Sequence, residues 1–264
     1  MTGSGTEQDP YIVDNWEDFT AVTNASTAEI YVKWADSDNK IIDFNDIKPE
    51  GFSEAVYFPA NCDFNGWTLK NFSSNASKAI RSFSTNTKSN IISNLNIENF
   101  YFKSEESFGY LNFKNCSFAG QSYSTSSNSF SNQCSFTNCA INIKMYTVGQ
   151  GYIFSYTTCK NSDVIMNVSG SRVSITSNCY LYNSRFSGVI SVDSDAINIS
   201  IGYPCIFNIE SNRVFKLISG VGVSVFNSDL AEIYSSSKNL VGVTSEQMKN
   251  SEYLASIGFP IGVD

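Results

Sequence analysis

The residues in this sequence best suited to chemistry are carboxylates in its first quarter. They are Asp36, Asp38, Asp43, Asp46, Glu50 and, a little later, Asp63. Paired carboxylates act as general acid and base on glycosidic bonds, and a larger group holds Ca²⁺ through its oxygen atoms. The group lacks EF-hand spacing, and acidic side chains are common on a solvated surface, so a purely structural role stays open beside the chemical one.

Other residues that support catalysis or metal binding are scarce. Histidine is absent, which excludes a histidine-based catalytic triad, a histidine metal site and a histidine pH switch. The seven cysteines are Cys62, Cys116, Cys134, Cys139, Cys159, Cys179 and Cys205. Their odd number, wide scatter and lack of a CxxC pair argue against a disulfide framework or a zinc site. We therefore expect buried free thiols, a reducing compartment, no metal and no cofactor.

The composition indicates an ordered protein with an uncharged polar surface. Of the 264 residues, 42 are serine and 29 are asparagine, while 16% are charged and 42% are hydrophobic. This apolar content is too high for a disordered chain. The net charge of −8 argues against binding to nucleic acid or to an anionic membrane. No run approaches the ~18 apolar residues of a membrane span, and residues 1–10 lack the features of a secretory signal peptide.

A short unit repeats along the chain: an asparagine, a small or apolar residue one position later, and an apolar residue three positions later. Its copies begin at Asn94, Asn115, Asn138, Asn161, Asn183 and Asn227. The first five copies are 21 to 23 residues apart, and the last interval of 44 residues equals two periods. A copy without asparagine is expected at Cys205, and Asn71 is a candidate for an earlier first copy.

This period predicts stacked strands. The side chains one and three positions after each asparagine lie on the same face of a strand. A strand of three or four residues cannot bury that face alone, but stacking equivalent strands from successive turns buries it. The sequence therefore predicts an all-β fold, a parallel β-helix formed as a solenoid with 22–23 residues and about three short strands per turn.

The repeated asparagines are expected at the corners of the turns, because asparagine tolerates the left-handed backbone conformation. Stacked asparagines either form a hydrogen-bonded ladder along the solenoid or simply mark surface turns, and both interpretations stay open. Asp163, Arg185 and Asp229 share the outward position two residues after the asparagine. Asp163 and Arg185 of neighbouring turns would there form a surface ion pair of small value.

Helices are predicted at both ends, where a stack of strands must protect its unpaired edges. Asp14–Glu17 has the spacing of a capping box and precedes a short helix. Thr244–Gln247 repeats this pattern before a helix over Glu246–Ser256, which Gly258 would end. These patterns divide the chain into an N-terminal cap (1–29), a parallel β-helix (30–240) and a C-terminal helical cap (241–264).

The two ends also carry a resemblance to a known family. Gly3–Val13 with Trp16–Phe19, and Val243–Leu254 with Gly258 and Phe259, resemble the ends of β-helical structural proteins from bacteriophages of gut Firmicutes. Bacterial surface β-helix proteins begin similarly. The match is close at the ends and holds only by pattern in the middle. It implies a right-handed parallel β-helix and no catalytic residues.

Three functions are open, and the first is favoured. It is a structural protein of a phage virion (fibre, tail appendage or head decoration), made in the host cytoplasm, whose rigid shaft contacts the host surface or other virion proteins. The expected partners are two further copies in a homotrimer, other virion proteins and host cell-surface glycan, with no nucleic acid and no membrane insertion. The alternative is a glycan-degrading β-helix enzyme, a lyase or hydrolase that uses the carboxylates above. The third is a bacterial surface adhesin.

Overall fold

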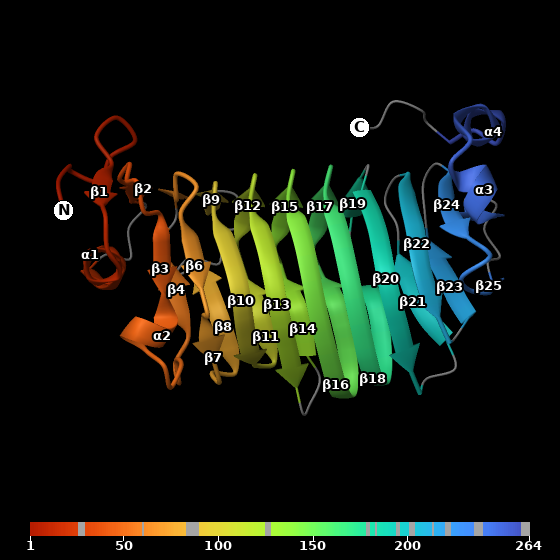
Figure 1. The fold of residues 1–264 in the computed structure, drawn as a ribbon, viewed down its shortest axis with the longest axis horizontal. Coiled ribbons are helices and arrows are strands. Elements are labelled where there is room, and N and C mark those ends of the chain that lie inside the picture. The colour runs from red at the N-terminus through yellow and green to blue at the C-terminus, as the bar shows by residue number, and fades with distance from the viewer. Residues whose placement is uncertain are drawn as a thin grey trace.

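The computed structural model is an elongated β-solenoid of about seven turns (Figure 1). It describes residues 1–25, 30–59, 61–82, 90–124, 128–177, 180–182, 184–193, 196–200, 204–212, 214–219, 223–234 and 240–259. Every pairing between its named strands is parallel. The predicted parallel β-helix is therefore confirmed.

The strands form two sheets that wrap the same core. The first, which we call sheet A, contains β1 (Tyr11–Val13), β2 (Tyr31–Trp34), β5 (Asn61–Asp63), β9 (Ile91–Ser93), β12 (Asn112–Lys114), β15 (Ser135–Thr137), β17 (Thr158–Lys160) and β19 (Tyr180–Tyr182). Its strands are short, and each pairs with the equivalent strand of the next turn. Because β1 pairs with β2, strand stacking begins ahead of the predicted boundary at residue 30.

The second sheet, sheet B, contains the longer strands and bends around the rest of each turn. Its N-terminal half contains β3 (Ile41–Asp43), β4 (Val56–Phe58), β6 (Thr68–Lys70), β7 (Ser73–Ser74), β8 (Lys78–Ser82), β10 (Asn96–Lys103), β11 (Glu106–Gly109), β13 (Ser117–Ser124) and β14 (Asn128–Asn132). Its C-terminal half contains β16 (Ala140–Ser155), β18 (Asp163–Ser177), β20 (Ser184–Val192), β21 (Ala196–Ser200), β22 (Cys205–Ser211), β23 (Val214–Ser219), β24 (Ser224–Asn227), β25 (Ile233–Tyr234) and β26 (Leu240–Val243).

The strand register confirms the predicted inward face. The positions one and three residues after Asn94, Asn115, Asn138 and Asn161 are at most 3% exposed. Cys205 pairs with Ser184 of the preceding turn, as predicted for the copy of the repeat that lacks asparagine. Phenylalanine rings continue this core along the axis; the ring centroids of Phe113 and Phe136 lie 5.2 Å apart with an interplanar angle of 14°.

The period is regular only in the middle of the solenoid. Paired residues of β2 and β5, and of β5 and β9, are 30 positions apart in the chain. Paired residues of β22 and β24 are 19 positions apart, and those of β24 and β26 are 16 apart. Asn227 therefore lies in register with Asn208, because Phe226 pairs with Phe207. The prediction that Asn227 continues the repeat two periods after Asn183 is wrong, because the turns shorten toward the C-terminus.

The repeat unit has a local cause at the corners of the turns. Asn94, Asn115, Asn138 and Asn161 all have φ between 49° and 54°, the left-handed region that asparagine tolerates best after glycine. After Asn115, Asn138 and Asn161, the next side chain hydrogen-bonds the carbonyl oxygen two residues back. Cys139 Sγ donates to Thr137 O at 3.4 Å and Ser162 Oγ donates to Lys160 O at 2.9 Å. At these three corners the residue after the asparagine is small and able to donate, whereas Asn94 is followed by the buried Leu95.

The same corner chemistry explains some of the cysteines. Cys134 Sγ donates to Asn132 O, and Thr157 Oγ1 donates to Ser155 O, across a second corner with positive φ at Gln133 and Tyr156. The six cysteines within the described residues are buried thiols outside any disulfide, as predicted. Burial raises the pKa of the Cys134 and Cys205 thiols to about 12. Cys179 lies outside the described residues.

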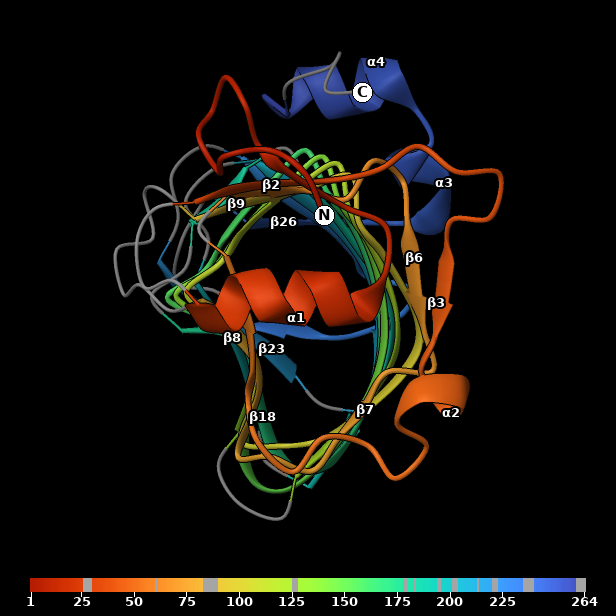
Figure 2. The same ribbon diagram turned by 90° about the vertical axis from the view of Figure 1, so that its left-hand side faces the viewer.

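Helices lie at both ends of the solenoid. α1 (Trp16–Ala25) lies across the N-terminal opening (Figure 2) and buries Phe19 completely. Its first-turn hydrogen bond runs from Asp18 N to Asn15 Oδ1, one residue later than the predicted box. At the other end, α3 (Ser245–Met248) has the predicted capping box between Thr244 and Gln247. Asn250 caps a separate helix, α4 (Ser251–Ser256), so the predicted single helix is two.

Candidate functional site

The candidate carboxylates have separate local partners. Asp36 lies in the loop after β2 and pairs with Lys40 at 2.8 Å, with 88% of its side chain exposed. Asp43 caps the short helix α2 (Phe44–Ile47), where its Oδ1 accepts from Asn45 N. Asp63 lies on sheet A and accepts from Asn65 N and from the Asn94 side chain. Each of these three carboxylates thus has its own structural partners: Asp36 pairs within its loop, while Asp43 and Asp63 also accept from Asn71 and Asn94 of the next turn.

The remaining members of this group are Asp38, Asp46 and Glu50, and all three are exposed. The Lys48 ammonium lies 3.0 Å from a Glu50 carboxylate oxygen. Among the described residues, no group of three His, Cys, Asp or Glu side chains is placed to hold a metal ion. The structure therefore does not bring the predicted carboxylates together around one point. Some of them form structural contacts, and the others are exposed to solvent.

The electrostatics of this group also differ from those of a general acid. A general acid needs a carboxyl pKa raised toward neutrality. The hydrogen bond from Lys40 lowers the pKa of Asp36, and the hydrogen bond from Asn71 lowers the pKa of Asp43. Both shifts favour the charged carboxylate.

The lowered pKa of Asp43 predicts how its contribution to stability depends on pH. Folding favours the charged form, so this contribution is present above the ordinary carboxyl pKa and is lost as the pH falls through the lower folded value. Asp43→Ala should lower the free energy of unfolding near neutral pH, and this loss should shrink as the pH falls through the folded pKa of Asp43. Urea unfolding near neutral pH and over a series of acidic pH values measures the difference, with Asp38→Ala as the exposed control. Equal losses for the two variants near neutral pH would contradict the assignment.

Asparagine side chains connect successive turns. Asn138 Nδ2 donates to Asn115 Oδ1 at 3.2 Å, and Asn161 Nδ2 donates to Asn138 Oδ1 at 3.4 Å. At the equivalent corner of an earlier turn, Asn94 Nδ2 donates to Asp63 Oδ1 at 2.8 Å. These bonds favour the ladder over the interpretation as simple surface turns, and the bond between Asn161 and Asn138 is the longest of them. Asn183 lies outside the described residues.

A second ladder runs beside the first. Asn71 Nδ2 donates to Asp43 Oδ1 at 2.7 Å, and Asn99 Nδ2 donates to Asn71 Oδ1 at 2.5 Å. Asn71 is therefore in register with Asn99 and not with Asn94, which corrects its placement as a first copy of the repeat. At the C-terminal end, Asn227 Nδ2 donates to Asn208 Oδ1 at 2.7 Å.

The corner at Asn138 gives a prediction that separates backbone conformation from hydrogen bonding. Asn138→Ala should lower the free energy of unfolding by about 1–3 kcal/mol, because alanine in the left-handed region is strained. Asn138→Gly removes the same ladder bonds without that strain and should cost less. Urea denaturation of both variants measures the order. A glycine variant as unstable as the alanine variant would show that the ladder bonds, and not φ, dominate.

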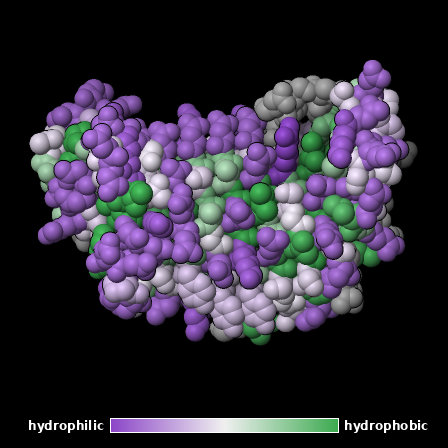
Figure 3. Space-filling model, viewed as in Figure 1, coloured by the Kyte–Doolittle hydropathy of each residue, from purple (hydrophilic) through white to green (hydrophobic). Residues whose placement is uncertain are grey.

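The broad outer face of sheet B mixes polar and apolar side chains (Figure 3). The rings of Tyr123 and Tyr146 stack on neighbouring turns, with centroids 5.1 Å apart and an interplanar angle of 7°. Tyr101 and Tyr146 are 45% and 43% exposed, and Ile165 and Val189 are 44% and 42% exposed. Aromatic residues are enriched at protein interfaces, so the exposed tyrosines make this face a candidate contact surface.

A groove of about 780 Å³ hollows this face near its C-terminal end (Figure 3). Its lining comes from β18, β20, β22, β24 and α3, and includes Asp163, Arg185, Ile165, Ile206, Met248 and Lys249. Asp163 and Arg185 occupy paired positions of neighbouring strands, as the repeat predicted. Asp229, which was assigned to the same position, instead accepts from Ser245 N at 2.6 Å.

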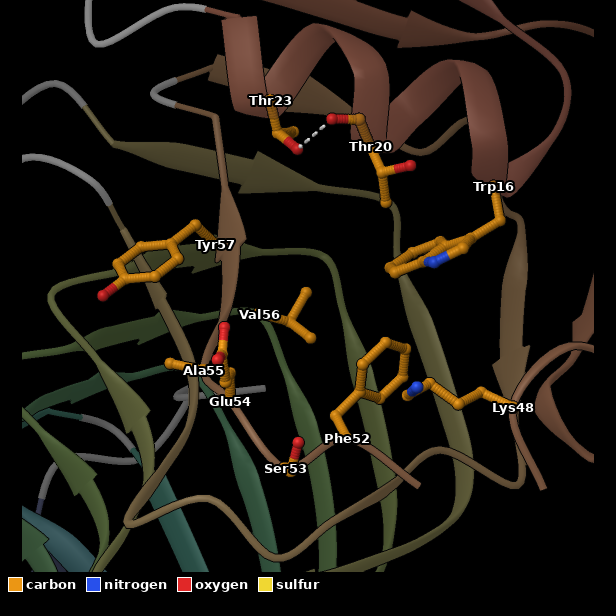
Figure 4. Close-up of a pocket in the computed structure, with 10 residues that line it drawn as sticks. All are labelled: Trp16, Thr20, Thr23, Lys48, Phe52, Ser53, Glu54, Ala55, Val56 and Tyr57. Atoms are coloured by element: carbon orange, nitrogen blue, oxygen red, sulfur yellow. Dashed lines mark hydrogen bonds between the residues drawn. The ribbon is translucent and has the colours of Figure 1, made fainter. Parts of the chain in front are cut away.

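A smaller pocket of about 290 Å³ lies between α1 and the segment before β4 (Figure 4). Trp16 and Phe52 form its aromatic wall, with ring centroids 6.2 Å apart. The Lys48 ammonium lies 5.6 Å above the Phe52 ring. The sequence did not predict either hollow, because the residues that line each one come from different turns and share no motif. The shared repeat position of Asp163 and Arg185 was the one sequence pattern that pointed to residues of the groove.

The fold and these surfaces define a class: the chain is a parallel β-solenoid protein with helical ends. No family model matches the chain, and no curated protein matches it. Within the described part of the chain, no helix is long and apolar enough to cross a membrane.

Proposed function

We propose that the chain is a structural protein of a bacteriophage particle, acting as a rigid shaft in a fibre, tail appendage or head decoration. The observation that carries this proposal is the continuous core. Aromatic rings pack on one another from Phe19 of α1, through Trp16 and Phe72, to Phe226 near the last turn, and helices lie at both ends. A solenoid with such a core resists bending because each turn packs on the next.

The use of the acidic residues supports this proposal over the enzymatic alternative. Asp43 and Asp63 hold asparagine ladders, and Asp36 forms an exposed ion pair. Carboxylates that stabilise the turns of the solenoid suit a structural shaft. The resemblance of the two ends to phage β-helical proteins points in the same direction.

Fractionation of phage particles tests the proposal. An antibody against the purified chain should detect it in particles banded on a density gradient from cells that release the encoding phage. Labelling should mark one morphological part of the particle in electron micrographs. Detection of the chain only in the cell envelope would overturn the proposal in favour of the surface adhesin.

A polysaccharide assay tests the enzymatic alternative. The purified chain should release no new reducing ends from capsular or cell-wall polysaccharide of the host. Release that is lost in Asp43→Asn or Asp63→Asn variants that remain folded would overturn the structural assignment of these carboxylates and establish the lyase or hydrolase.

A further inference from the structure

The groove beside α3 combines an apolar floor with positive charge. Ile165, Ile206 and Met248 line it, and Arg185 and Lys249 contribute two cations against the single carboxylate of Asp163. Its residues come from α3 and from four strands of sheet B, each paired with the next, so it runs along the solenoid. An apolar hollow with charges at its rim is typical of a site that receives a protein segment.

The same chain exposes a projection with complementary properties. β3 and α2 protrude from the side of the tube near its N-terminal end (Figure 2). On them Ile41 is 51% exposed and Ile47 is 48% exposed, and the neighbouring Asp46 is exposed as well. The projection therefore offers aliphatic side chains and negative charge, which match the floor and the rim of the groove.

The distribution of charge along residues 1–222 agrees with this match, whereas residues 223–264, which include α3, contain 5 acidic and 2 basic side chains. Residues 1–63 contain 13 acidic and 3 basic side chains, whereas residues 64–222 contain 7 acidic and 12 basic ones. The N-terminal end is thus strongly negative, and the body that carries Arg185 is positive. Opposite potentials favour contact between the N-terminal end of one copy and the body of another, and they disfavour contact between two N-terminal ends.

We propose that the groove beside α3 binds the β3–α2 projection of a second copy of this chain. Ile47 would enter the apolar floor, and Asp46 would approach Arg185 and Lys249. Because two different surfaces meet, the contact is heterologous. Repeated around a closed ring it gives the trimer expected for a phage appendage, and repeated without closure it gives a filament. The role of this contact in a phage particle rests on the proposed function, whereas the contact itself does not.

Site-directed cross-linking tests the contact. The double variant Ile47→Cys/Lys249→Cys, treated with a short bis-maleimide, should give covalent oligomers on a denaturing gel. Each single variant should stay monomeric, because a heterologous contact brings position 47 to position 249 and not to itself. The matched control is Ile91→Cys/Lys249→Cys, since Ile91 is 44% exposed but lies on sheet A. Cross-linking of the double variant no greater than that of this control would overturn the proposal.

Charge exchange adds a test that does not depend on cross-linking. The wild-type chain should show by light scattering a mass of three times 29.1 kDa, or a rising mass if the contact does not close. Lys249→Glu should weaken association about tenfold, and adding Asp46→Lys should restore it. Lys160→Glu, an exposed lysine on sheet A, is the control. A wild-type chain that stays monomeric, or a double variant that is not restored, would refute the contact while leaving the particle test of the shaft unaffected.

Discussion

Replacing Phe108 with alanine is expected to lower the free energy of unfolding by about 3–5 kcal/mol. Phe108 lies on β11 and is completely buried. Its ring contacts the rings of Phe100, Phe102, Phe113, Phe118 and Phe130, with centroids 5.2 to 6.3 Å apart. These rings come from two successive turns, so the cavity left by alanine would loosen both turns at once.

Urea denaturation followed by circular dichroism measures the loss. Tyr101→Ala is the matched control, because it removes a nearby aromatic ring that is 45% exposed and should cost much less. In a solenoid each turn contacts only its neighbours, so hydrogen exchange should accelerate most in β8, β11 and β14. A loss no larger than that of the control would contradict the role assigned to the phenylalanine core.

The regular middle of the fold could be predicted from sequence because one local requirement recurs in every turn. Each corner needs a residue that tolerates positive φ and a residue after it that faces the core, which at Asn138–Cys139 and Asn161–Ser162 is also a small donor. The repeat therefore revealed both the register and the inward face. The repeat did not predict the register of Asn71 and Asn227. Asparagine also forms ladders elsewhere in the turn, and the number of residues per turn changes toward both ends.

The candidate site was harder to predict because proximity in sequence does not imply a shared site. Asp36 and Asp43 flank a single strand, β3, yet one pairs with a lysine and the other caps a helix. The groove shows the converse. Ile165, Ile206 and Met248 meet there because the solenoid returns to the same place once per turn, and apolar residues on an outward face follow no recognisable spacing.

Removing either partner of the ion pair between the buried Glu106 and the partly buried Arg81 is expected to cost about 3–5 kcal/mol. Their side chains are 8% and 18% exposed, and Arg81 Nε lies 3.4 Å from Glu106 Oε1. Asn132 Nδ2 donates to the other carboxylate oxygen at 2.7 Å, and the Arg81 guanidinium lies 4.9 Å above the Tyr110 ring. Glu106→Gln would leave the Arg81 charge buried without a counter-ion, and Arg81→Met would do the same to Glu106.

A double-mutant cycle separates the pair from its surroundings. The Arg81→Met/Glu106→Gln variant buries neither charge, and the glutamine oxygen can still accept from Asn132. It should therefore be more stable than either single variant. That result requires a coupling free energy between the two substitutions well above the ~0.5 kcal/mol deviation from additivity seen at independent sites. The pair joins β8 to β11, strands 28 residues apart in register, so such coupling would identify it as a contact that aligns two turns. Single-variant losses that simply add would show that Glu106 and Arg81 are stabilised by other neighbours and not by each other.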